Sequence, residues 1–195
     1  MLILLNFLYV PFYKYVPFMK YNHRLAELQD IPSIELLMQQ SITNLLGAYV
    51  TEDELEASKE SMGLDDQLIK DKTYFLIYCN DTLVGCGGWS NRKTLFGGNH
   101  TPNRSNELLD PNRDAAKIRA MYTHPMWARK GIGSLVLRLA EQNALDYGFK
   151  HCELMATLSG IHLYKNRGYK ISEEIFYESK QGNQVKMFKM KKNLS

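Results

Sequence analysis

Hydrophobic and polar positions follow two periods along the chain, and each period predicts a type of element. The segment KYNHRLAEL favours a first strand. In the segment SIELLMQQSITNLL, apolar residues recur every three or four positions, which predicts a helix that begins near Asp30 and Pro32 and ends at Gly47. Thr51 and Glu54 have the spacing of a capping box, so a second helix is expected to start there.

Later runs have the composition of strands. TYFLIY and TLVGCGGW are rich in β-branched and aromatic residues and are separated only by Cys79, Asn80 and Asp81, so they predict a hairpin. The glycines before Trp89 indicate either a close approach of substrate to the backbone, or a bulge or tight sheet packing. AKIRAMYTHP predicts a strand that Pro125 ends, and FKHCELMA predicts another strand.

The segment between these two strands predicts an amphipathic helix. Its apolar residues are spaced i, i+3, i+4, i+7 and i+8, which places them on one helix face, and Gly148 is a suitable C-cap. These residues are Ile132, Leu135, Val136, Leu139 and Ala140. A strand, a helical crossover and a second strand form a right-handed unit whose two strands are expected to be parallel neighbours.

The turn before this helix, ARKGIGS, has the features of an anion site. Gly131 and Gly133 lack the Cβ atoms that would block a ligand, so successive backbone N–H groups can point at one anion at the positive end of the helix. Arg129 and Lys130 add positive charge. The natural ligand is a phosphate or pyrophosphate, although neither a P-loop nor the full dinucleotide fingerprint is present.

Composition limits the class of protein. A chain of 195 residues with 45% hydrophobic and 23% charged residues is consistent with one globular domain, and a net charge of +3 without a basic cluster predicts no nucleic-acid partner. The cysteines Cys79, Cys86 and Cys152 have no metal-ligand spacing and lie in apolar runs, so we expect no metal and a reducing, cytoplasmic location.

The N-terminal segment is different from the rest of the chain. It is apolar and aromatic, contains the tandem hexamers YVPFYK and YVPFMK, and is interrupted by Pro11 and Pro17. We expect no stable membrane insertion, because the apolar run is too short to span a bilayer. Residues 1–19 are interpreted as an extension that stems from a misassigned start or serves as a membrane-surface or partner anchor, and residues 20–195 as one domain.

The polar stretch from Ser90 to Asp114 is too long for a simple connection. It carries four basic residues, Arg92, Lys93, Arg104 and Arg113. We interpret it as a solvated loop, with an anion-binding substrate loop as the alternative.

From about residue 20 to residue 191 the chain resembles the Gcn5-related N-acetyltransferase (GNAT) family. The resemblance rests on IRAMYTHPMWARKGIGSLVLRLAEQNALDYGF, which matches the family's acetyl-CoA motif with its R/Q-x-x-G-x-G/A loop, and on LMATLSGIHLYKNRGY. It implies an α/β (α+β) fold: a mixed, mostly antiparallel sheet, flanked by helices, with a central parallel strand pair that splays apart, and a closing hairpin formed by KISEEIFYE and QVKMFKMK. A bulge in AKIRAMYTHP is the expected cause of the splay.

The resemblance also implies roles for individual residues. Acetyl-CoA would be the acyl donor, with Tyr164 as the catalytic residue that donates a proton or hydrogen bond to the departing thiolate. Main-chain groups of Met121, Tyr122 and Thr123 would contact the pantetheine arm. The pyrophosphate would be held by Arg129, Lys130, Gly131, Ile132, Gly133 and Ser134. One departure is Ala128, which stands where the family has its leading Arg or Gln, so Arg129 or Lys130 is expected to substitute.

The function expected from this resemblance is acetyl transfer to a primary amine of a small molecule or protein, by direct attack on the thioester. A non-catalytic acyl-CoA-binding or sensing module on the same fold is the alternative, because no general base is evident. His124, His162 and Glu153 are candidates for that base, and a water chain is another. The acceptor and the oligomeric state are left open by the sequence, a homodimer being one option.

Overall fold

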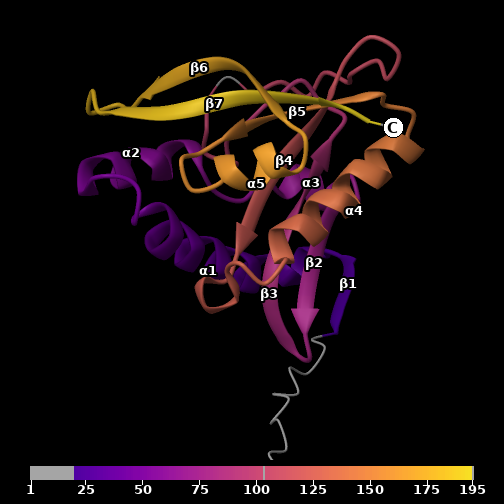
Figure 1. The fold of residues 1–195 in the computed structure, drawn as a ribbon, viewed down its shortest axis with the longest axis horizontal. Helices are drawn as coiled ribbons and strands as arrows, with labels where there is room; N and C mark the ends of the chain where they lie inside the picture. Colours follow the sequence, from indigo (N-terminus) through magenta and orange to yellow (C-terminus); the bar gives the residue numbers. More distant parts are fainter. Residues whose placement is uncertain (1–19, 103, 195) are drawn as a thin grey trace, which may run out of the picture.

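The computed structural model describes residues 20–102 and 104–194, and within them the strands form one mixed sheet. The strand order is β1-β2-β3-β4-β5-β7-β6, and β4 and β5 form the parallel pair while the other neighbours are antiparallel (Figure 1). The strands are β1 (Tyr21–Leu25), β2 (Tyr74–Cys79), β3 (Thr82–Ser90), β4 (Ala116–Thr123), β5 (His151–Ala156), β6 (Lys170–Glu178) and β7 (Gln184–Asn193). The predicted fold class is confirmed.

The helices are α1 (Ile31–Ser41), α2 (Glu52–Ser61), α3 (Asp66–Lys70), α4 (Ile132–Asp146) and α5 (Ile161–Asn166). Short turns of other helix types are η1 (Leu28–Asp30), η2 (Ile42–Leu46), which continues α1, and η3 (Pro125–Trp127). The capping box of α2 is confirmed, since Glu54 N–H donates to Thr51 Oγ1 at 3.3 Å and Thr51 N–H donates to Glu54 Oε2 at 2.8 Å. Helix α3 was not predicted, because its five residues are too few for a periodic pattern.

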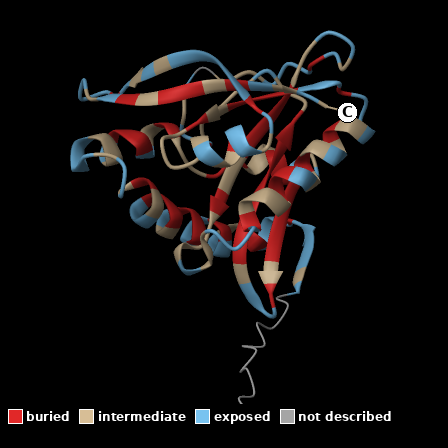
Figure 2. Ribbon diagram, viewed as in Figure 1, coloured by how far each residue is buried: buried red, intermediate tan, exposed pale blue. Residues whose placement is uncertain are grey.

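Helices cover both faces of the sheet. Along β2, successive side chains point to opposite faces, so Tyr74 and Leu76 pack in a cluster with Ile34 of α1, whereas Ile77 packs with Val136 of α4. Figure 2 shows buried residues concentrated in the central strands and on the inward faces of α1 and α4, and exposed residues along most of β6. The central strands are therefore packed between α1 on one face of the sheet and α4 on the other.

The glycines of β3 permit close packing of α4. A Cβ atom at Gly85 would lie 2.3 Å from Ile132 Cγ2, and one at Gly87 would lie 2.7 Å from Val136 Cγ1. Trp89 is buried and its Nε1 donates to Asn143 Oδ1 of the same helix at 2.8 Å. Of the two interpretations of these glycines, the structure supports tight packing, of α4 on Gly85 and Gly87 and of the Thr73 backbone on Gly88.

The parallel strands separate after two paired positions. β5 pairs with β4 at Ala116–Cys152 and at Lys117–Glu153. Beyond these pairs β4 contains a bulge, because the register with β3 shifts and Ala120 has a φ of 50°. Tyr74 Oη donates to the Ala120 carbonyl at 2.7 Å, which holds the bulged backbone. The expected splay and its cause are both present.

Two arginines of the segment from 90 to 114 pair with carboxylates next to α3. Arg92 donates to both carboxylate oxygens of Asp71 at 2.7 and 2.8 Å, and Arg104 pairs with Asp65. Asp65 and Asp71 cap the two ends of α3. Arg92 and Arg104 therefore bind the chain itself, which was not predicted because their acidic partners lie next to this short helix, far from the segment in sequence.

The prediction for residues 1–19 lies outside the described residues. Within the part that the structure describes, no helix has the length and apolar character needed to cross a membrane.

Candidate functional site

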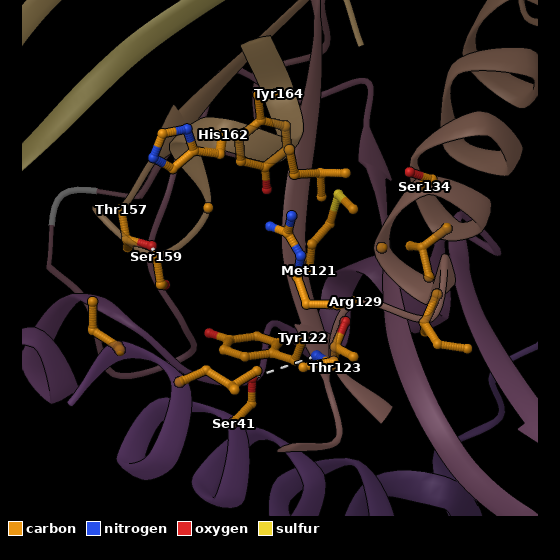
Figure 3. A pocket seen from close by; sticks show the side chains of 18 of the residues that line it. Ser41, Met121, Tyr122, Thr123, Arg129, Ser134, Thr157, Ser159, His162 and Tyr164 are labelled. Atoms are coloured by element: carbon orange, nitrogen blue, oxygen red, sulfur yellow. Dashed lines mark hydrogen bonds between the residues drawn. The ribbon is translucent and has the colours of Figure 1, made fainter. Parts of the chain in front are cut away.

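A cavity of about 400 Å³ lies where the sheet opens. One wall comes from the end of α1 and from η2, including Ser41, and the floor comes from the last residues of β4 (Figure 3). The turn before α4 and the start of α5 complete it, with Arg129 and His162 among their residues. The cavity therefore joins the predicted anion loop to the predicted catalytic tyrosine.

The start of α4 has the geometry of an anion site. Gly131 is its N-cap with a φ of 87°, and a Cβ atom built there would meet nothing within 4 Å. The N–H groups of Ile132, Gly133 and Ser134 belong to the first turn, where a helix leaves its donors unpaired. Arg129 also lines the cavity, and its side chain is seen there in Figure 3.

Two residues of the predicted anion loop have different surroundings. A Cβ atom at Gly133 would lie 2.9 Å from Leu163 Cδ2, so this glycine also lets α5 pack against α4. The Lys130 ammonium lies 4.8 Å from the centre of the Trp127 ring, and Lys130 is not among the residues that line the cavity. All the other residues assigned to the site from the sequence do line it: Met121, Tyr122, Thr123, Arg129, Gly131, Ile132, Gly133, Ser134 and Tyr164.

The strand β4 brings its last residues to the cavity through the bulge. Tyr122 is 7% exposed, and its hydroxyl accepts a hydrogen bond of 3.2 Å from Gly63 N–H. Burial raises the pKa of the Tyr122 phenol well above its usual value. This phenol is therefore protonated at neutral pH and is tied to the segment after α2.

Tyr164 lies on α5 and lines the same cavity as the anion loop. It is 9% exposed, and its ring packs edge-on against Tyr169 with ring centres 5.9 Å apart. Burial raises the pKa of its phenol to about 12. Figure 3 shows its hydroxyl directed into the cavity, so the side chain can donate a hydrogen bond there.

A second cavity of about 90 Å³ adjoins the first. Residues that line both cavities are Met62, Met121, Tyr122, Thr157 and Tyr164. The apolar side chains of its other walls are Leu95, Phe96, Ile118, Met155 and Met187, and polar side chains come from Ser61 and Arg119. A group in the small cavity and a group in the large one would meet beside Tyr164.

The candidate bases are not brought together. His124 caps η3, where its Nδ1 accepts from Met126 N–H at 3.2 Å, and only His162 lines the large cavity. Glu153 is buried and paired with Lys117, so it neither lines the acceptor pocket nor faces solvent. Of the described residues that line the two cavities, none is an aspartate or glutamate.

Sequence reasoning missed several polar residues of the large cavity. Ser41 lies on the same face of its helix as Ile34 and Leu37, so a serine in an apolar stripe was the available signal. Thr157 and Ser159 directly follow β5, at the carboxyl end of a parallel strand, where ligands often bind. In the part of the chain that the structure describes, no cluster of three metal-ligating side chains is found.

Comparisons with known proteins agree with this geometry. The sequence model of the acetyltransferase (GNAT) family matches residues 40–169. No match was found among curated proteins. A GCN5-related N-acetyltransferase structure from Rhodopseudomonas palustris has a TM-score of 0.66 at 16% identity, over 89% of this chain and 95% of that chain.

Two similar structures were solved with a ligand. The PaiA N-acetyltransferase from Thermoplasma acidophilum, in complex with coenzyme A, has a TM-score of 0.59 at 14% identity, over 90% of this chain and 99% of that chain. YncA from Salmonella typhimurium, with its cofactor acetyl-CoA, has a TM-score of 0.60 at 14% identity, over 90% of this chain and 95% of that chain. At these identities the likeness concerns the fold.

Proposed function

The chain belongs to the GNAT acetyltransferase family, and on this premise we propose that it transfers an acetyl group from acetyl-CoA to a primary amine by direct attack on the thioester. The observation that carries the proposal is one continuous cavity that is lined both by the anion loop and by the buried Tyr164. The adjoining small cavity, which Tyr164 also lines, is the proposed binding site of the acceptor amine.

The residues present fit a CoA thioester. Its pyrophosphate needs donors and positive charge, which the first turn of α4 and Arg129 supply. Ala128 lines the cavity and brings no polar group, so Arg129 takes over the side-chain contact in this proposal. Lys130 is held against Trp127 and acts only through its backbone and its charge. PaiA and YncA, crystallised with coenzyme A and acetyl-CoA, support this choice of donor.

Acetyl-CoA would supply an acetyl group that is activated as a thioester. The main chain of β4 around Tyr122 lies where β5 no longer pairs with it, and we assign to one of its N–H groups the stabilisation of the tetrahedral oxyanion. The acceptor amine must be neutral to attack. We assign its proton to water or to His162, because no carboxylate lines either cavity within the described chain and His162 lines the large one.

Tyr164 serves as a hydrogen-bond donor to the departing sulfur. Its pKa of about 12 is about 3.5 units above that of a free thiol near 8.5, so full proton transfer to the thiolate is unfavourable by about 5 kcal/mol. A hydrogen bond to a charged acceptor stabilises it without that transfer, typically by about 1.5–3 kcal/mol.

The test is release of free CoA thiol from acetyl-CoA when amines of different classes are added, with mass spectrometry of the acetylated products. The proposal predicts amine-dependent release at rates well above the hydrolysis seen without acceptor. Tight binding of acetyl-CoA with no transfer to any small-molecule or peptide amine would instead identify the chain as a CoA-binding or sensing module.

A further inference from the structure

We infer that the acceptor of the proposed reaction is a primary amine on an apolar group without a second cationic group, and that Arg119 and Phe96 determine this selectivity. The inference rests on the proposed function, because it concerns the small cavity beside Tyr164. Two observations support it: the residues that line the small cavity, and the contacts that fix the position of its wall at Leu95 and Phe96.

The wall of the small cavity is a strap formed by Leu95 and Phe96. Arg119 of β4 donates to the carbonyl of Thr94 at 2.7 Å and to the carbonyl of Gly97 at 2.6 Å, so one guanidinium group holds both ends of the strap. The Phe96 ring packs edge-on against Tyr177 of β6, with ring centres 6.3 Å apart. The wall is therefore fixed from the sheet on one side and from the C-terminal hairpin on the other.

The charges next to the cavity oppose a cationic substrate. Arg119 also donates to Asp65 Oδ2 at 2.9 Å, and Arg104 pairs with the same carboxylate. The Arg119 and Asp65 side chains are 2% and 3% exposed. One buried carboxylate thus stands between two guanidinium groups, which leaves an excess of positive charge beside the acceptor.

The lining offers no anionic partner for a second ammonium group. It contains thioethers, aliphatic groups and aromatic rings, the hydroxyl-bearing residues Ser61, Tyr122, Thr157 and Tyr164, and Arg119 as its charged side chain, with no Asp, Glu or His among the described residues. An ammonium group buried there would lose its hydration and lie near the positive charge of Arg119, with no carboxylate among the described lining residues to compensate. The same desolvation lowers the pKa of an amine and favours its neutral, nucleophilic form. Desolvation in this cavity therefore takes over part of the work of a general base, and the positive charge of Arg119 without a carboxylate in the lining selects monoamines.

Length-matched amines test the inference. n-Hexylamine and cadaverine have the same chain length, as do n-pentylamine and putrescine, and each pair differs only by a terminal methyl group in place of an ammonium group. We expect kcat/KM for the alkylamine to exceed that for its diamine by about tenfold or more in both pairs. Equal use of both members of a pair, or a preference for the diamine, overturns the inference.

Two variants show whether the strap is responsible. Phe96→Ala should raise KM for n-hexylamine by about fivefold or more and narrow the preference over cadaverine, since it removes the aromatic wall. Phe176→Ala on β6 is the matched control, because that ring is 54% exposed and does not line the cavity, and it should leave both values unchanged. The affinity for acetyl-CoA, measured by calorimetry, should be the same in all three proteins.

The outcomes separate the inference from the proposed function. Absence of acetyl-CoA binding, or binding without acetylation of any amine, contradicts the acetyl transfer itself. Acetylation of another amine class while both matched pairs are inert leaves the acetyl transfer standing and overturns the assignment of the acceptor, as does an unchanged amine preference in Phe96→Ala.

Discussion

At the scale of single residues, Tyr164 and Gly131 both line the large cavity and were both selected from the sequence. The position of Tyr164 in LYKNRGY was enough to select it, but its burial and its raised pKa of about 12 appear only in the folded chain. Gly131 was selected for open space around its α-carbon, and this property is present. Glu153 was considered as a base because the sequence could not indicate that Lys117 lies opposite it on the neighbouring strand.

Replacement of Tyr164 by Phe should lower kcat by about 10- to 100-fold, because one hydrogen bond to a developing thiolate is lost. The Kd for acetyl-CoA should remain within about twofold, measured by calorimetry. Since the pKa of Tyr164 is raised to about 12, the phenol keeps its proton through pH 10, and the unaltered protein should show no loss of rate near that pH from this group. Full activity of the variant across the pH range would remove Tyr164 from the mechanism.

Gly131→Ala should weaken acetyl-CoA binding by about tenfold or more, because the added methyl group occupies space that is open to a ligand. Gly182→Ala in the β6–β7 turn is the control. Its φ of 83° is close to the 87° of Gly131, and a Cβ atom placed on it would likewise meet nothing within 4 Å. Both variants should lose about 1–2 kcal/mol of stability. If both bind acetyl-CoA as well as the unaltered chain, Gly131 does not face the ligand.

At the scale of elements, most of what the sequence predicts is confirmed, and the differences have local causes. The helix before Gly47, the capping box, the β2–β3 hairpin and the unit of β4, α4 and β5 are present because each has a long periodic pattern or a specific cap. α3 escaped prediction because it is short. The acidic partners of Arg92 and Arg104 were not predicted either, since local sequence does not indicate ion pairs between distant residues.

The strands β4 and β5 separate beyond Lys117 and Glu153, and we call this point the fork. Its geometry depends on the ion pair between these two residues. Lys117 and Glu153 are 7% and 8% exposed, and Glu153 Oε2 also lies 3.6 Å from Lys189 Nζ. Glu153→Gln leaves buried positive charge without its partner and should lower the free energy of unfolding by about 3–5 kcal/mol in urea titrations. Glu174→Gln, which breaks the more exposed pair with Lys186, should cost less than about 1 kcal/mol. Similar losses in both variants would mean that the buried pair does not hold the fork.

At the scale of the whole molecule, the sheet opening, the anion loop and the two cavities are consequences of one topology. α4 packs tightly against the glycines of β3, the bulge at Ala120 turns β4 away from β5, and the space between them faces the N-terminal end of α4. The general plan was predictable from strand order and motif. The lining of the small cavity was not, because it combines Phe96 and Met187 from distant parts of the chain.

The most direct test is calorimetric titration of the purified chain with acetyl-CoA, with desulfo-CoA and ATP as comparisons. We predict binding of both CoA compounds at about micromolar Kd, equivalent to about −8 kcal/mol, with no comparable binding of ATP. Equal binding of ATP would mean that the loop at α4 is a general phosphate site. No binding of either CoA compound would contradict acetyl-CoA-dependent transfer by this protein.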